Sequence, residues 1–215
     1  MSTYLAKVAA AFTAAGMTGA SGFGAWKILN KNKTISIRNK VLASYGNRFS
    51  TFLLVGDSNW EKIKEEYGKS EAIYKPTRGG VDIKKDELPA WCENTVDSSF
   101  DERDNSKLDA VLRWCYVNTN NFQTQAEKLN KELHAGGSGD SAWKDAWETV
   151  YKGLKNDAQW KINYEDSELN GEDKEKGGPS LQKWCSSKLS IFMFSNEAPD
   201  SFPKFEKFCL KNKAG

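Results

Sequence analysis

Apolar positions recur at helical spacing along most of this chain. The clearest run follows i, i+4, i+7, i+8 and i+11, the stripe of an amphipathic helix, and consists of Trp143, Trp147, Val150, Tyr151 and Leu154. Residues 60–67 carry a shorter stripe of the same kind, and polar segments with glycine at 70–87 and 163–179 predict loops. The pattern therefore predicts an all-α protein with little strand.

A doubled phrase organises the body. Leu-x-x-Trp-Cys occurs at 88–92 and again at 181–185, and each copy is followed by an aromatic-Cys pair, Trp114-Cys115 and Phe208-Cys209. The cysteines are 23 residues apart in the first copy and 24 in the second. An internal repeat of this kind indicates two copies of one unit. We expect two tandem helical repeats of about three helices each, at 34–121 and 122–215.

Each cysteine lies on an apolar helical stripe. Leu88, Trp91 and Cys92 fall at i, i+3 and i+4, and the second copy repeats this spacing. We expect the two cysteines of each copy to meet between their helices. The aromatic residues at the same helical spacing predict the core rather than a ligand platform; they are Trp60, Tyr67, Trp91, Trp114, Trp143, Trp147, Tyr151, Trp184 and Phe208.

The state of the four cysteines bears on the compartment. Bridges Cys92–Cys115 and Cys185–Cys209 would each stabilise the fold by about 3 kcal/mol on the chain-entropy argument. Such bridges persist in oxidising surroundings, which predicts an extracellular body. Two alternatives stay open, namely reduced cysteines that act as small apolar core residues and a zinc site. Zinc sites usually contain Cys pairs two to four residues apart, and this sequence has none.

Charge is distributed unevenly. The chain has 215 residues, 39% of them hydrophobic, which is enough for a sizeable core. Residues 1–40 contain six basic residues and no acidic one, so the remainder carries 25 basic and 29 acidic residues. A mildly acidic body argues against nucleic acid as the main partner, because phosphate binding needs a basic surface.

The amino-terminal segment resembles a membrane anchor. Residues 8–26 contain no charge over 19 positions, close to the length that spans a bilayer. Gly16, Ala20 and Gly24 lie four apart, a spacing that suits close helix packing in a membrane. We expect residues 1–33 to form an Ala/Gly-rich anchor helix with a basic flank. A cleaved signal peptide and a soluble helix are the alternatives, and the basic flank would favour a cytoplasmic body by the positive-inside rule.

Catalytic and metal-binding patterns are weak. His134 is the single histidine and follows no nucleophile motif, so we expect a solvent-exposed loop or helix-end residue. The acidic run at 165–173 lacks the ligand spacing of an EF-hand, which favours a solvated loop. The sequence therefore predicts no catalytic, cofactor or metal site and no cofactor.

Taken together, the Ala/Gly-rich start, the Trp-to-Tyr helix and the doubled Leu-x-x-Trp-Cys phrase resemble a large paralogous protein family of haemotropic mycoplasmas. The resemblance covers the whole chain, with Phe208 standing where Trp is usual. It implies no catalytic residue. It implies exposed surface proteins that vary under host immunity.

The function that we expect from these features is non-enzymatic. The predicted protein is membrane-anchored through its amino-terminal helix and serves host interaction or antigenic variation, with a host surface or immune protein as partner. The alternative is a structural or scaffolding protein that faces the cytoplasm and has reduced cysteines. An enzyme of another type ranks third.

Overall fold

A computed structural model describes residues 35–134 and 140–213. The predicted anchor at 1–33, with Gly16, Ala20 and Gly24, lies outside these residues. Within the two described ranges, no helix has both the length and the apolar character needed to cross a membrane. The chain divides into two compact units, residues 1–119 and 120–215, which we call unit 1 and unit 2.

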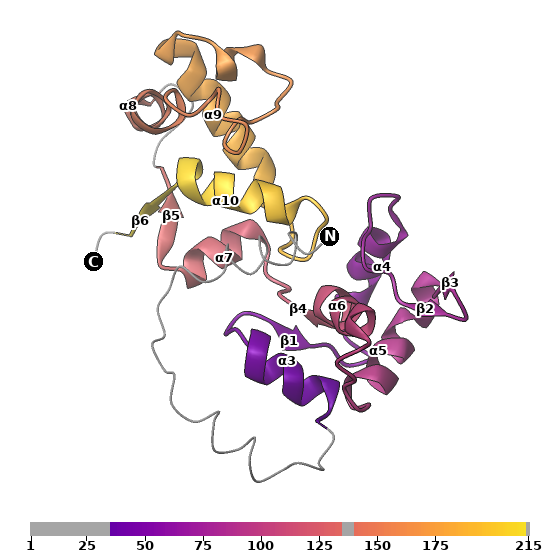
Figure 1. The fold of residues 1–215 in the computed structure, drawn as a ribbon. Coiled ribbons are helices and arrows are strands. Elements are labelled where there is room, and N and C mark those ends of the chain that lie inside the picture. The colour runs from indigo at the N-terminus through magenta and orange to yellow at the C-terminus, as the bar shows by residue number, and fades with distance from the viewer. Residues whose placement is uncertain (1–34, 135–139, 214–215) are drawn as a thin grey trace. The chain divides into compact units, whose positions relative to one another are not determined.

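In residues 35–119, unit 1 contains four α-helices, two short two-stranded sheets and one 3-10 turn (Figure 1). In chain order these are α3 (Ile37–Tyr45), β1 (Thr51–Phe52), α4 (Trp60–Gly68), β2 (Thr77–Arg78), β3 (Val81–Asp82), η1 (Lys85–Glu87), α5 (Leu88–Val96), α6 (Asn105–Trp114) and β4 (Tyr116–Val117). Strand β1 pairs antiparallel with β4, and β2 pairs with β3.

In residues 120–134 and 140–213, unit 2 contains four further α-helices and one sheet. Its elements are α7 (Phe122–Lys128), β5 (Lys131–Leu133), α8 (Ser141–Ala146), the π-helix η2 (Trp147–Tyr151), the 3-10 turn η3 (Ser167–Asn170), α9 (Lys174–Lys188), α10 (Ala198–Cys209) and β6 (Leu210–Asn212). Strand β5 pairs antiparallel with β6.

The all-α prediction is wrong, because each unit closes with a strand pair. Strand β4 begins directly after Cys115, and β6 begins directly after Cys209. Strand β4 pairs with β1, which precedes α4, and β6 pairs with β5, which precedes α8. These strands are two or three residues long, too short to produce a two-residue alternation that a sequence pattern would reveal. The described residues are mixed α and β, with four α-helices in residues 35–119 and four in the described part of unit 2.

The two units share one order of elements. When only the α-helices and the closing strand pair are counted, both run helix, strand, helix, helix, helix, strand in the described residues. The first helix of each is capped by a polar side chain, Ser36 in unit 1 and Asn121 in unit 2. Each cap residue also forms a β-bridge to the connection between the two cysteine helices, Ser36 to Ser99 and Asn121 to Phe192. The correspondence therefore begins at residue 35 in unit 1 and at residue 120 in unit 2.

The units differ in the segment before the first cysteine helix, which lies between α4 and α5 in unit 1 and between η2 and the middle of α9 in unit 2. Unit 1 carries the hairpin β2–β3 there, and its turn residues Gly79 and Gly80 have φ of 61° and 81°, a backbone that favours glycine. Unit 2 carries η3 and the amino-terminal half of α9 instead. The loop predictions for 70–87 and 163–179 are thus wrong in part, because both segments contain regular structure.

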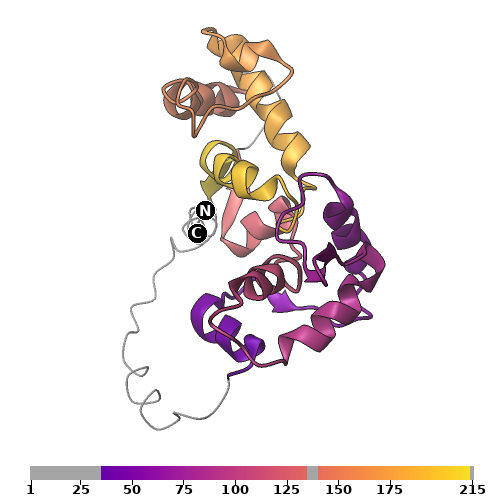
Figure 2. The same cartoon turned by 45° about the vertical axis from the view of Figure 1, so that its right-hand side comes forward.

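Glycines set a close helix contact in unit 2, where α8 and η2 pack on the amino-terminal part of α9 (Figures 1 and 2). A Cβ at Gly177 would lie 2.3 Å from the Trp147 indole, and one at Gly178 would lie 2.7 Å from the Lys144 backbone. Glycine alone allows this approach, since any side chain would overlap the opposite element. The two glycines are buried, although the sequence placed them in a solvated loop.

Candidate functional site

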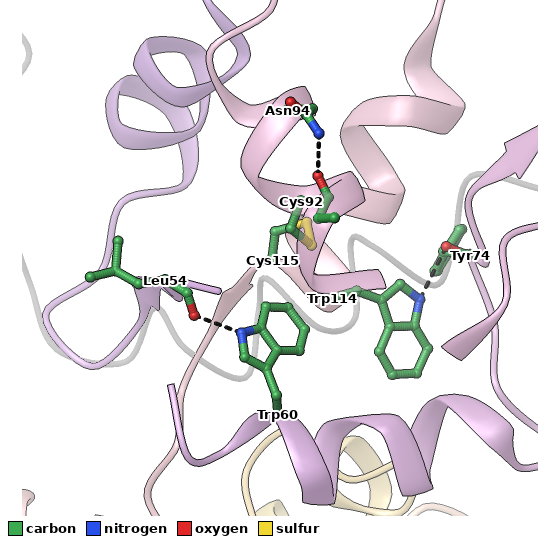
Figure 3. Close-up of a disulfide and its surroundings, with 8 residues drawn as sticks. Leu54, Trp60, Tyr74, Cys92, Asn94, Trp114 and Cys115 are labelled. Carbon is green, nitrogen blue, oxygen red and sulfur yellow. Dashed lines mark hydrogen bonds between the residues drawn. A yellow bond between two sulfur atoms is a disulfide. The ribbon is translucent and has the colours of Figure 1, made fainter. Parts of the chain in front are cut away.

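The cysteines form two buried disulfides, which confirms the predicted bridges. Cys92 of α5 is bonded to Cys115 at the end of α6, and Cys185 of α9 to Cys209 of α10. The Cα atoms are 5.4 Å apart in the first pair and 5.7 Å in the second. Figure 3 shows the first bridge near Trp60 and Trp114. No thiolate is left for the zinc alternative, since all four sulfurs are oxidised.

An edge-to-face aromatic pair stands beside each disulfide. The rings of Tyr67 and Trp114 are 5.0 Å apart at 78°, and those of Tyr151 and Phe208 are 5.0 Å apart at 83°. Trp114 and Phe208 each directly precede the second cysteine of their unit. The duplication therefore preserves geometry as well as sequence, and edge-to-face pairs add stability beyond the area that they bury.

Phe208 differs from Trp114 in one polar group. The Trp114 indole N–H donates to the carbonyls of Ile73 and Tyr74, at 3.0 and 3.1 Å. Figure 3 shows the bond to Tyr74. Phe208 has no such donor. Trp160 packs edge-on against Phe208 instead, with ring centres 5.9 Å apart.

The two tyrosine hydroxyls are tied to backbone and amide groups. Tyr67 donates to the Ile83 carbonyl at 2.5 Å, and Tyr151 donates to Asn170 Oδ1 at 2.7 Å. Burial, with help from nearby carboxylates, raises the pKa of Tyr67 to about 12. Burial also raises the pKa of Tyr151. Both hydroxyls thus stay neutral and hydrogen-bonded at physiological pH, which suits a structural role.

Eight of the nine predicted core aromatics are buried. They are Trp60, Tyr67, Trp114, Trp143, Trp147, Tyr151, Trp184 and Phe208. Buried indole N–H groups find backbone carbonyls, as in Trp60 to Leu54 at 2.7 Å and Trp147 to Leu169 at 2.8 Å. These contacts satisfy donors that would otherwise be costly to bury.

Trp91 is the exception, since it is only half-buried. The buried stripe of α5 follows Leu88, Cys92 and Val96. Neighbouring residues lie about 100° apart around a helix, so Trp91 stands at the edge of that stripe. Its counterpart Trp184 is buried in unit 2. The prediction of a core position is therefore wrong for Trp91.

His134 lies directly after β5, and its ring packs edge-on against Trp143 with centres 5.3 Å apart. Its backbone N–H donates to the Cys209 carbonyl at 3.1 Å, just as that of Leu53 donates to Cys115 in unit 1. Burial, and secondarily Lys211, lowers the pKa of His134. The expectation of a solvent-exposed loop or helix-end residue holds in part: His134 lies in neither helix nor strand, but it is half-buried because its ring packs against Trp143 of α8.

Lys155 is a buried cation that sequence reasoning missed. Its Nζ donates to the Gly171 carbonyl and to Glu172 Oε1, the latter at 2.6 Å, and it faces the Trp147 ring. Its position four residues after Tyr151 and eight after Trp147 was the available signal, since this spacing continues the apolar stripe. Lys155 lowers the pKa of Glu172. Part of the acidic run thus pairs with a buried cation, with the Glu172 carboxylate on the solvent side.

Two other acids of this run form caps. Asp166 accepts from the backbone of Glu168 at the start of η3, and Asp173 from that of Glu175 at the start of α9. Across residues 35–134 and 140–213, no group of three or more His, Cys, Asp or Glu side chains is arranged to hold a metal ion. The arrangement is a duplicated frame centred on two disulfides. The buried polar groups described above hydrogen-bond to other groups of the same chain.

No family model, curated protein or solved structure matches this chain.

Proposed function

We propose that this protein is a membrane-anchored, non-enzymatic surface protein whose body lies outside the cell and binds a protein of a host. The observation that carries the proposal is the pair of buried disulfides, one at the same place in each unit. Cytosolic reductants keep most thiols reduced, so two structural bridges favour an oxidising compartment.

The interior is the same in the two units while a surface segment differs, and this also supports binding rather than catalysis. The disulfide, the edge-to-face aromatic pair and the closing strand pair recur in both units. The segment before the first cysteine helix differs, with hairpin β2–β3 in unit 1 and η3 in unit 2. Loops displayed on a rigid scaffold are where binding specificity usually resides.

The chemistry of the most reactive side chains points the same way. The sulfurs are bonded, both core tyrosines have raised pKa values, and the His134 ring packs against Trp143. The resemblance to the haemotropic-mycoplasma family favours a host surface or immune protein as the partner. The predicted helix at 1–33 would supply the membrane anchor.

Thiol counting and surface labelling together test the proposal. Full-length protein from the cells that make it should contain no free thiol when it is denatured in an alkylating reagent. An amine reagent that cannot cross the membrane should label lysines of the body in intact cells, while a cytosolic marker stays unlabelled. Four alkylated cysteines and no surface labelling would overturn the proposal and favour the cytoplasm-facing scaffold.

A further inference from the structure

Three hydrogen bonds form a closed network between η2 and η3 in unit 2. The Tyr151 hydroxyl donates to Asn170 Oδ1 at 2.7 Å, and Asn170 Nδ2 donates to the Ile162 carbonyl at 3.1 Å. The Ile162 N–H donates in turn to the Tyr151 oxygen at 3.2 Å. We call these three residues the Asn170 network. Both ends of the Asn170 amide are bonded within it, so the side chain cannot rotate without breaking a hydrogen bond.

Asn170 is also the one asparagine of the sequence that is followed by glycine. An asparagine in this position deamidates readily, because the glycine has no side chain to keep its backbone nitrogen away from the asparagine Cγ. The Gly171 nitrogen attacks the Asn170 Cγ, the Cγ–Nδ2 bond breaks, and ammonia leaves with the proton of the Gly171 N–H. Water then opens the cyclic imide at either carbonyl, which gives aspartate or isoaspartate. The reaction consumes water, releases ammonia and needs no other reactant.

Hydrogen bonds of the folded protein restrain both reacting groups. The Gly171 N–H donates to the Glu168 carbonyl at 3.1 Å, at the end of η3. Leu169, the residue before Asn170, is fully buried, and its carbonyl accepts the Trp147 N–H at 2.8 Å. The Gly171 nitrogen can therefore attack the Asn170 Cγ only after η3 opens and the Asn170 network breaks. Short elements can open in this way without unfolding of the whole chain.

The corresponding tyrosine of unit 1 is bonded to the backbone instead. Tyr67 donates directly to the Ile83 carbonyl at 2.5 Å. Tyr67 and Tyr151 correspond, because each packs edge-on against the aromatic residue that precedes the second cysteine of its unit. The shared fold thus does not require an asparagine beside this hydroxyl. The asparagine-glycine sequence occurs only in unit 2.

We propose that Asn170 is a site of spontaneous modification, which stays intact while unit 2 is closed and deamidates when η3 opens. The product then prevents the Asn170 network from forming again. An aspartate at this position can accept from Tyr151, but it has no N–H for the Ile162 carbonyl, and its negative charge faces that oxygen. An isoaspartate also lengthens the backbone beside the buried Leu169. Opening of this part of unit 2 thus becomes irreversible.

Ageing of the full chain at mildly alkaline pH, with and without guanidinium chloride, tests the inference. Peptide mapping by mass spectrometry measures the loss of the Asn170 amide, and enzymatic methylation detects isoaspartate. Two hydrogen bonds hold the amide, so deamidation in the folded protein should be slower than in the unfolded chain by at least about tenfold. Equal rates in the two conditions would overturn the inference.

Matched tyrosine variants test whether the Asn170 network gives the protection. Tyr151→Phe keeps an aromatic ring against Phe208 but removes the hydroxyl, so deamidation at Asn170 should be about fivefold faster, the effect of one hydrogen bond. Tyr67→Phe, the control in unit 1, should leave this rate unchanged. Equal rates at Asn170 in the two variants would overturn the inference.

The variant Asn170→Asp tests whether the product keeps this part of unit 2 open. It has the side chain of one of the two products, so hydrogen exchange in residues 162–171 should be faster than in the wild type. Exchange in α5 and α6 of unit 1 should be unchanged. Wild-type exchange at 162–171 in this variant would show that the modified chain closes normally, which would also overturn the inference.

Discussion

At Gly177, a hydrogen atom in place of a side chain decides how closely α9 can approach Trp147. The position of a Cβ there, 2.3 Å from the indole, is far inside van der Waals contact. The Trp147 side chain cannot move away freely, because it is fully buried and its N–H is bonded to Leu169. A single methyl group must therefore displace a helix or a core tryptophan.

The substitution Gly177→Ala should lower the free energy of unfolding by about 1–3 kcal/mol through overpacking. Gly153→Ala is the matched control in the same unit, because nothing lies within 4 Å of a Cβ at that position. It should change stability by less than about 0.5 kcal/mol. Urea unfolding followed by tryptophan fluorescence measures both. Equal effects would contradict the steric explanation.

The residue before the second cysteine is Trp114 in unit 1 and Phe208 in unit 2, so the two residues can be exchanged in a reciprocal pair of variants. Trp114→Phe removes two hydrogen bonds and leaves a cavity beside Tyr67, so the unfolding free energy should fall by about 2–4 kcal/mol. Phe208→Trp should also destabilise, by about 1–3 kcal/mol, because Tyr151 and Trp160 already pack around Phe208. Denaturant titration of both variants checks these values, and a stabilised Phe208→Trp protein would show that unit 2 has unused room.

Among the elements, helices and disulfides were predictable and strands were not. The i, i+3, i+4 pattern around Cys92 and Cys185 marks real helices, and the similar spacing in the two copies, 23 and 24 residues, favoured the bridges. Strands β4 and β6 leave no pattern, because their register is set by the strand that they join. The start of α9 was not predicted, because its acidic and glycine residues are typical of a loop. The structure shows that Gly177 is needed there for the close approach to Trp147.

We predict that the stability of the fold depends on pH through His134, which directly follows strand β5. The folded-state pKa of His134 is lowered below the ordinary value near 6.5. Between the two pKa values the unfolded chain binds more protons, so stability rises with pH there. The stability that the neutral ring contributes is present above pH of about 6.5 and is lost as pH falls through the folded-state pKa.

Thermal unfolding of wild type and His134→Phe between pH 5 and 7.5 measures this effect. The wild-type midpoint should fall more steeply on acidification than that of the variant, which keeps a ring against Trp143 but does not titrate. Carboxylate titration is common to both proteins and cancels in the difference. Parallel midpoint curves would mean that the environment of His134 does not alter its protonation.

For the whole molecule, duplication gives each unit its own means of stabilisation. Each has a disulfide, an aromatic pair and a closing sheet formed from its own residues. Such units can unfold separately, because the contacts that stabilise one are not used by the other. A protein built in this way can change loops in one unit without weakening the other.

Removing one bridge tests that independence. Cys92→Ala with Cys115→Ala releases a constraint on 23 residues and should destabilise unit 1 by about 3 kcal/mol. Hydrogen exchange should then quicken in α5 and α6 and stay unchanged in α9 and α10. The reciprocal variant, Cys185→Ala with Cys209→Ala, should give the opposite pattern. If either pair of substitutions quickened exchange equally in both units, they would unfold as one cooperative body, and the duplicated frame would not confer separate stability.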